Sequence, residues 1–405
     1  MENKKNEEED SFIGETIFEK YKLLEKIGQG AFGSIYKAQL INTNKFYAIK
    51  FEDMNQSQYI LEKESYYLSY LNIPQIPKFR AFGYFGSYII LIMELLGKSL
   101  DKILSENSYS KLSLRCVCNI AYQLISILEI IHAFSLIHCD LKPENIAIGE
   151  GERSNYIYLI DFGLSREYRD YKTKKHFPFV ENKVLNGNAR YSSINALDGG
   201  TQSRKDDLES LGYLIIYLVL GKLPWQGYVS HSNDDKYYKI KEIKKQTTPE
   251  QLCNGLPMQF KDYLNYTINL KYEEEPNYDY LKNLFISVLE QKGHKFDFFY
   301  DWNKGKQYKI KNYNLNSYKK KANIYPEISI KIHNLINKRK KLEDKFESNE
   351  YVLSEEKFEW NSINNEIQES NNTYDNNSTN NIINNTRRSR RDRERKEVSS
   401  CCIIF

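Results

Sequence analysis

The chain changes its hydrophobic pattern once, and this change limits its fold more than any other feature of the sequence. From Tyr21 to Glu94, short β-branched and aromatic runs are broken by Gly and Asn, which is typical of strands, with one helical stretch near 58–71. Beyond Leu100 the pattern becomes helical. A strand-rich part followed by a helix-rich part predicts an α+β domain with a small antiparallel β-rich lobe and a larger helical lobe. The long helices are expected at 114–131, 206–220 and 257–269, the first of them amphipathic.

The sequence divides into four expected parts. Residues 1–17 are polar, with an acidic beginning, and we expect disorder there. The two-lobed domain is expected over 18–305. Residues 306–386 predict an amphipathic helix over 326–350 and then an Asn-rich flexible tether. Residues 387–405 are strongly basic at first and end in a short apolar run.

Composition and charge argue against several other classes of protein. A net charge of +4 over 405 residues is too small to imply a nucleic-acid partner. The six cysteines form no CxxC pair, so neither a zinc site nor a redox motif is supported. The N-terminus lacks the apolar stretch of a signal peptide, and the longest apolar run, 211–220, is far shorter than the ~20 residues of a membrane span. We therefore expect a cytosolic monomer.

A glycine-rich stretch, IGQGAFGSIY at 27–36, fits the pattern G-x-G-x-x-G. Glycines let a β-hairpin backbone approach phosphate oxygens closely. The rival dinucleotide-binding motif needs a helix that starts at the third glycine, whereas here a strand pattern follows. We expect a hairpin that covers a nucleotide. The residues expected to contact the nucleotide are Ile27, Gly28, Gly30, Gly33 and Ile35.

The next strand carries a lysine, in the tetrapeptide YAIK at 47–50. Lys50 is expected to bind the α- and β-phosphates, and such a lysine needs a carboxylate to hold it in position. Glu64 is the preferred partner, because the apolar stripe of its predicted helix has the matching spacing. Glu62 remains an alternative, and one of the two is an ordinary surface charge.

The stretch HCDLKPEN at 138–145 has the residue types of a phosphoryl-transfer loop. Asp140 is expected to accept the proton of the substrate hydroxyl, Lys142 to neutralise charge on the γ-phosphoryl group, and Asn145 to bind magnesium. A lysine two positions after the aspartate favours Ser or Thr over Tyr as the phosphorylated residue. A capped turn before proline is the ordinary alternative, but the number of matching positions disfavours it.

The last of these stretches is IDFGLS at 160–165, after a strand-like run. Asp161 is expected to chelate magnesium, and Phe162 to pack beneath the helix that carries Glu64. Taken in order, the four stretches predict phosphoryl transfer from ATP with Mg²⁺ as the metal. The expected catalytic residues are Lys50, Asp140, Lys142, Asn145 and Asp161, with Asn145 and Asp161 as the metal ligands.

With these motifs in place, the sequence resembles the protein kinase superfamily and, within it, the casein kinase 1 family. The resemblance covers roughly residues 18–303. It is most specific in GNARYSSIN at 187–195 and along 203–227 and 257–285. It implies the bilobal protein kinase fold and a protein serine/threonine kinase activity.

The resemblance also assigns roles to further residues. Asp207 is implied to brace the catalytic loop from a long buried helix. Met93 is implied at the back of the adenine pocket, and Glu94 to Leu96 form the hinge beside adenine. Family members favour substrates with an acidic or phosphorylated residue N-terminal to the target. The matching anion-binding residues are Arg190 and Lys236, although an ordinary surface lysine is the alternative for Lys236.

Two stretches depart from the family pattern. Cys139 replaces the usual arginine of the catalytic loop, which suggests an activity that does not wait for phosphorylation of the activation loop. It also leaves only Arg166 and Lys183 for a second basic pocket. Residues 233–235 are Asn-Asp-Asp, where relatives carry basic residues, and this weakens both acidic-substrate recognition and nuclear targeting through that stretch.

The C-terminal residues predict a membrane anchor. Cys402 begins a C-a-a-X pattern, whose final Phe indicates geranylgeranylation, and Cys401 beside it is a candidate for palmitoylation. The basic run 387–396 is expected to attract anionic lipid by up to ~1 kcal/mol per basic residue, which supplies the second signal that stable anchoring needs. We expect the protein at the cytoplasmic face of the plasma membrane or an endomembrane. The alternatives are a soluble nuclear kinase with a basic import signal and a catalytically inactive scaffold.

Overall fold

A computed structural model of the chain describes residues 12–30, 33–56, 60–106, 110–181, 187–227 and 233–303. The predicted helix over 326–350, the Asn-rich tether, Lys183 and residues 387–405 with Cys401 and Cys402 lie outside these residues.

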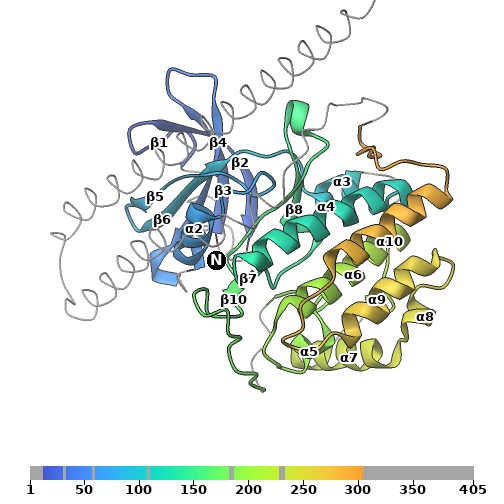
Figure 1. Cartoon of the computed structure of the whole chain (residues 1–405). Coiled ribbons are helices and arrows are strands. Elements are labelled where there is room, and N and C mark those ends of the chain that lie inside the picture. Colours follow the sequence, from blue (N-terminus) through green and yellow to red (C-terminus); the bar gives the residue numbers. More distant parts are fainter. Residues whose placement is uncertain are drawn as a thin grey trace, which may run out of the picture.

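The N-terminal lobe is built on one antiparallel sheet. Within the described residues six strands form it, in the order β1-β2-β3-β4-β6-β5, and Figure 1 shows them gathered on one side of the helical part. The strand-rich pattern of residues 21–94 predicts this sheet, and the predicted helical stretch separates its fourth and fifth strands in the chain. The strands are β1 (Thr16–Ile17), β2 (Tyr21–Gly30), β3 (Gly33–Leu40), β4 (Phe46–Asp53), β5 (Phe79–Phe85) and β6 (Tyr88–Glu94).

One helix, α2 (Ile60–Tyr70), packs against β5 and β6 of this sheet. Its apolar residues Leu61 and Leu68 are buried in one cluster with Leu91 of β6. At its first turn the buried carboxylate of Glu52 accepts a hydrogen bond from the Leu61 amide at 2.6 Å, which satisfies one of the amides that a helix start leaves unpaired. The β4 strand therefore fixes the position of α2, and with it the helix face that carries Glu64.

The C-terminal lobe is helical, as the sequence pattern predicts, and lies on the other side of the molecule (Figure 1). Ser113 caps the helix over 114–133 by accepting a hydrogen bond from the Cys116 amide, and Gly221 ends the helix over 204–220 in the left-handed conformation at φ 79°. The helices are α3 (Leu100–Glu106), α4 (Leu114–Ala133), α5 (Ile194–Leu197), α6 (Arg204–Leu220), α7 (Asn233–Gln246), α8 (Pro249–Leu252), α9 (Met258–Asn269) and α10 (Tyr278–Gln291).

The predicted helix over 114–131 is confirmed as α4, and its apolar stripe is buried; its polar side is largely buried as well, because the protein covers this helix on nearly every side. Among the described residues α4 is also the helix long and apolar enough to cross a membrane, but 83% of its apolar window is buried inside the protein. Its polar residues have internal partners: the amide of Gln123 accepts a hydrogen bond from the Ile157 backbone at 3.0 Å, and Glu129 pairs with Lys282 at 2.9 Å. The helix is therefore the central core helix of the lobe.

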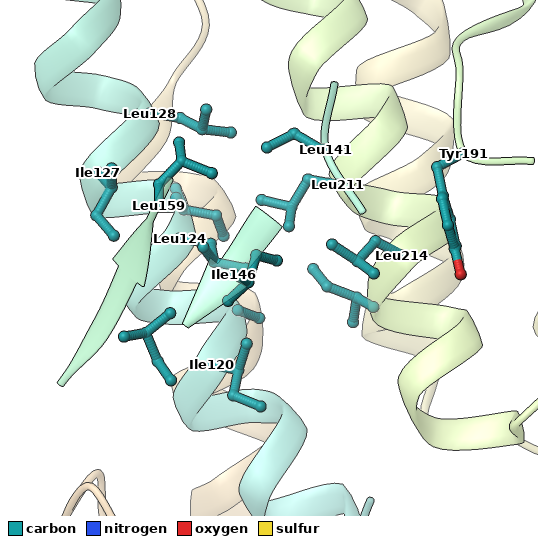
Figure 2. Close-up of a cluster of buried hydrophobic side chains, with 14 of the residues drawn as sticks. Ile120, Leu124, Ile127, Leu128, Leu141, Ile146, Leu159, Tyr191, Leu211 and Leu214 are labelled. Atoms are coloured by element: carbon teal, nitrogen blue, oxygen red, sulfur yellow. The ribbon is translucent and has the colours of Figure 1, made fainter. Parts of the chain in front are cut away.

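The buried side chains around α4 attach the stretches 138–145 and 160–165 to rigid helices. Figure 2 shows Leu141, Ile146 and Leu159 packed between α4 and α6. Large core residues of this kind cost about 2–5 kcal/mol when truncated to alanine, so the loops that carry them are firmly held. The labelled partners on the two helices are Ile120, Leu124, Ile127 and Leu128 of α4 with Leu211 and Leu214 of α6.

Candidate active site

Two short strand pairs bring the stretches 138–145 and 160–165 side by side. β7 (Leu136–Ile137) pairs with β10 (Arg166–Glu167), and β8 (Ile146–Ile148) pairs with β9 (Ile157–Leu159), both antiparallel. Each stretch therefore connects a strand of one pair to a strand of the other pair. The Ile160 amide donates to the Asn145 carbonyl at 2.9 Å, which places the two expected metal ligands, Asn145 and Asp161, in neighbouring segments.

Lys50 of β4 reaches both carboxylates that surround it. Its Nζ lies 2.7 Å from Oε2 of Glu64 and 3.2 Å from Oδ1 of Asp161. Glu62 instead accepts a hydrogen bond from the Tyr84 hydroxyl at 2.9 Å. Glu64, the partner preferred from the sequence, is thus the one that contacts Lys50. The expectation that the other glutamate is a surface charge is wrong, because Glu62 is also buried. The Phe162 amide also donates to Oε1 of Glu64 at 3.3 Å, so α2, β4 and the 160–165 stretch meet at one point.

The charges at this point stabilise one another. Burial disfavours the ammonium of Lys50, but Asp161 and Glu64 outweigh this effect and raise the pKa of Lys50. Burial likewise acts to raise the pKa of Asp161, but Lys50 outweighs it and the pKa is lowered. At neutral pH the site therefore holds a lysine cation against an aspartate anion, as a site that positions phosphates and a metal requires.

The two carboxylate oxygens of Asp140 differ in their hydrogen bonding. Its Oδ2 accepts hydrogen bonds from Lys142 Nζ at 2.6 Å and from Asn145 Nδ2 at 2.9 Å. Its Oδ1 is buried and has no hydrogen-bond partner within the described part of the chain. A buried acceptor without a partner is costly, and it suits an oxygen that takes a proton from a bound hydroxyl group. A Cβ added at Gly187 would lie 3.3 Å from this oxygen. Glycine at this position therefore leaves room for a hydroxyl group to approach Oδ1.

Asp207 of α6 holds the backbone of the catalytic loop, as the resemblance implied. Its carboxylate accepts hydrogen bonds from the His138 amide at 2.7 Å and the Cys139 amide at 2.9 Å, and contacts His132 Nε2 at 3.0 Å. Cys139 has φ 67°, a conformation that costs a residue with a side chain about 1–3 kcal/mol. The two bonds to Asp207 stabilise this strained turn and so fix where Asp140 lies.

The glycine-rich stretch forms the β2–β3 hairpin. The strand register places Gly28 opposite Ile35 and Ile35 opposite Lys50, so these three expected nucleotide contacts lie across consecutive strands. Gly33 has φ +135°, and a Cβ there would lie 1.7 Å from the Phe51 carbonyl oxygen. Only glycine fits at this position. A Cβ on Gly28 would meet only ordinary contacts, so that glycine is not sterically required.

The expected hinge connects the two lobes. Met93 pairs with Ala48 across β6 and β4, and the Gly97 amide donates to the Ile148 carbonyl at 2.9 Å. Leu96 packs against a small buried cluster that includes Ala147. Apolar side chains from both lobes therefore border the hinge, as a flat aromatic base requires.

Two further contacts at the hinge were not anticipated from the sequence. Glu94 forms an ion pair with Arg153, and Lys102 Nζ donates to the Ile27 carbonyl at 2.9 Å, so each joins one lobe to the other. No motif signals them, because their partners lie far apart in the sequence.

The expected anion-binding residues line the same cavity as the catalytic loop. This cavity has a volume of about 640 Å³, and Arg190 and Lys236 share its lining with Asp140 and Lys142. Trp225 Nε1 donates to the Arg190 carbonyl at 2.8 Å and holds that backbone in place. The cavity thus joins the carboxylate of Asp140 to a pair of cationic side chains.

Arg166, expected in a second basic pocket, lies against the residue that replaces the usual arginine. Its Nε donates to the Cys139 thiol sulfur at 3.3 Å, and it contacts Gln202 at 3.4 Å. Burial raises the pKa of the Cys139 thiol to about 12, which keeps it protonated and unreactive at neutral pH.

The residues present fit a divalent cation held together with phosphate. Asn145 and Asp161 offer amide and carboxylate oxygens, which are the ligands that hard cations prefer, and Lys50 occupies only Oδ1 of Asp161. Among the described residues no group of three or more His, Cys, Asp or Glu could hold a metal by itself. Phosphate oxygens commonly complete such a site. A bound cation would supply charge neutralisation on those phosphates.

These geometries agree with a comparison against known families. A family model for the protein kinase domain matches residues 21–289, which is more than half of the chain. The matched region begins with β2 and ends within α10, and it contains every residue expected to be catalytic. The chain therefore belongs to the protein kinase family, whose members transfer phosphate from ATP with the help of a divalent metal.

Proposed function

We propose that this protein is a serine/threonine kinase of the casein kinase 1 type, which uses Mg²⁺–ATP and phosphorylates acidic or already phosphorylated protein substrates. The observation that carries the proposal is the cavity that joins Asp140 and Lys142 to Arg190 and Lys236. A substrate whose hydroxyl lies at Asp140 can present an anionic side chain to the two cations. Charge-assisted hydrogen bonds of this kind are roughly twice as strong as neutral ones.

The proposed reaction uses the unpartnered oxygen of Asp140. Oδ1 of Asp140 accepts the proton of the substrate hydroxyl, whose oxygen attacks the γ-phosphorus while the bond to the β-phosphate oxygen breaks and ADP leaves. Lys142 places a positive charge beside Asp140, and its position two residues further on supports Ser and Thr as targets. Lys50 holds the phosphates of the donor. Positioning and positive charge thus supply most of the catalysis.

The proposal includes an activity that needs no phosphate on the activation loop. Cys139 stands where most kinases carry the arginine that grips such a phosphate, and its sulfur contacts Arg166 at 3.3 Å. Lys50, Glu64 and Asp161 are already in contact in the unmodified chain. We expect phosphatase treatment to leave the rate unchanged, and a requirement for activation-loop phosphate would remove this part of the proposal.

The substrate class is tested with matched peptides that differ N-terminal to a single serine. We expect the purified full-length protein to phosphorylate peptides with aspartate or phosphoserine there at least tenfold more efficiently than peptides with alanine or lysine. Arg190→Gln and Lys236→Gln should each raise KM for the anionic peptides by about tenfold, the value of one lost charged hydrogen bond, and leave the alanine peptide unaffected. Equal turnover of all four peptides would refute the assignment.

The proposal also places the enzyme, as a monomer without a nucleic-acid partner, on the cytoplasmic face of a membrane. It rests on Cys402 in its C-a-a-X pattern, on Cys401, and on the basic run 387–396, all outside the described residues. We expect Cys402→Ser to move the full-length protein to the soluble fraction of a cell lysate. Unchanged partition, or an unmodified C-terminal peptide by mass analysis, would favour the soluble nuclear alternative.

A further inference from the structure

A lysine that the catalytic mechanism does not use is buried beside the substrate cavity. Lys244 lies on α7, and only 2% of its surface is exposed. Lysine is almost never buried to this extent unless its charge has partners. Its neighbours on α7 behave differently, because Lys241 and Lys245 reach the partly exposed Asp198 at 3.4 and 2.8 Å. Lys244 alone of these three points into the protein.

The amine of Lys244 binds the backbone that carries Arg190. Its Nζ donates to the Ala189 carbonyl at 3.1 Å and to the Ser192 carbonyl at 2.5 Å. Trp225 Nε1 donates to the carbonyl of Arg190, which lies between them. Three backbone carbonyls within four residues are thus held by two side chains from outside the segment. We refer to residues 189–192 as the arginine segment.

Aromatic rings and one carboxylate complete the surroundings of the amine. Nζ lies 4.4 Å from the Tyr213 ring centroid and 4.9 Å from that of Trp225, distances at which a cation is attracted to a ring face. The carboxylate of Glu209 on α6 interacts electrostatically with the Lys244 amine. It also accepts hydrogen bonds from the Ile194 amide and the Tyr213 hydroxyl. Burial lowers the pKa of Lys244 to about 7, and Glu209 opposes this effect. An amine that is neutral can still donate to both carbonyls.

The face of α7 that carries Lys244 continues to the rim of the cavity. Lys236 and Ile240, which line the cavity, precede Lys244 at intervals of four residues, and residues four apart lie on one face of a helix. One helix face therefore supplies a cation at the rim, an apolar wall, and the amine that holds the arginine segment. The separation of Arg190 from Lys236 depends on how α7 is attached to that segment.

We propose that Lys244 is a positioning residue, which attaches α7 to the arginine segment and thereby sets the spacing of Arg190 and Lys236 for an anionic substrate residue. This inference rests on the proposed substrate class and adds the residue that organises its recognition. It differs from a purely structural role in one respect: loss of Lys244 should affect the recognition of anionic peptides far more than the binding of ATP.

The test compares full-length Lys244→Met with Lys245→Met, a matched control that removes the adjacent, exposed lysine. Each is assayed with the phosphoserine, aspartate and alanine peptides and for KM of ATP. We expect Lys244→Met to raise KM for the two anionic peptides about tenfold or more, the usual cost of lost buried hydrogen bonds, with KM for the alanine peptide and for ATP within about twofold. Lys245→Met should match the wild type. Lys244→Arg, which keeps N–H donors for the two carbonyls, should recover part of the preference.

A double variant distinguishes action through Arg190 from an independent effect. If Lys244 acts by placing Arg190, Arg190→Gln with Lys244→Met should lose little more preference than Arg190→Gln alone. Additive losses, or equal losses for ATP and all peptides, would overturn the inference. Circular dichroism will show whether Lys244→Met folds. If it does not, Trp225→Phe takes its place, because this variant removes one hydrogen-bond donor to the arginine segment. An unchanged preference for anionic peptides in Trp225→Phe would equally overturn the inference. A wild type without any preference would instead refute the proposed substrate class.

Discussion

Replacing Glu64 by Gln changes the charge opposite Lys50 while keeping the size of the side chain. The pair is buried, with Lys50 6% and Glu64 1% exposed, and its atoms are 2.7 Å apart. A hydrogen bond between charged groups is worth about 1.5–3 kcal/mol, so its loss should lower kcat/KM for ATP about 10- to 150-fold. The larger penalty of about 3–5 kcal/mol for an unpaired buried charge does not apply in full, because Asp161 remains 3.2 Å from Lys50.

Glu62→Gln is the matched control for this prediction. Glu62 is on the same helix and is also buried, but it accepts its bond from Tyr84 rather than from Lys50. Steady-state kinetics with ATP varied at a fixed peptide concentration should show a large loss for Glu64→Gln and a change below about threefold for Glu62→Gln. Equal losses in the two variants, or wild-type kinetics in Glu64→Gln, would refute the reasoning that Lys50 is positioned by Glu64.

Three further predictions test other parts of the site. Gly33→Ala would bring a Cβ to 1.7 Å from the Phe51 carbonyl; we expect a higher KM for ATP and a lower Tm, and unchanged values would contradict the hairpin geometry. Asp207→Asn replaces an acceptor by a group that can donate; kcat should fall at least tenfold with ATP binding by calorimetry retained, whereas loss of binding would point to misfolding. The pKa of Lys244 near 7 lies below its ordinary value of 10.5, so the unfolded chain binds more protons between these pH values. From pH 7 to 9, the free energy of unfolding of the wild type should rise relative to Lys244→Met by up to about 1.4 kcal/mol per pH unit, and a flat difference in urea titrations would contradict the burial of the amine.

The sequence was sufficient to predict which residues the fold brings together, because phosphoryl transfer needs particular residue types at fixed spacing. Lys50 and Asp161, named in this way, lie 3.2 Å apart, and the switch from strand to helix patterns indicated the two lobes. The catalytic roles of these residues and of Asp140 stay predictions. The pattern favoured Glu64 but could not exclude Glu62, since both lie on the buried part of one helix and only tertiary contacts tell them apart.

Other features depend on long-range contacts that leave no local signal. The polar residues of α4 suggested a solvent-facing side, but Gln123 and Glu129 find partners in distant segments and can be buried. Nothing in the lysine-rich sequence of α7 distinguishes the buried Lys244 from its more exposed neighbours. The two cases share one physical cause: a polar side chain can be buried wherever the fold supplies its hydrogen bonds.

The central claim is that Lys50, Asp140 and Asp161 act together on a metal-bound nucleotide to transfer phosphate to a protein. The most direct measurement is the transfer of labelled γ-phosphate from ATP to a serine peptide by the purified full-length protein. The assay is run with Mg²⁺ and with excess chelator, and the variants Asp140→Asn and Asp161→Asn are measured in parallel. The account predicts metal-dependent transfer by the wild type and a loss of at least a thousandfold in both variants. Transfer that survives either substitution, or no transfer by folded wild type that binds ATP, would contradict it.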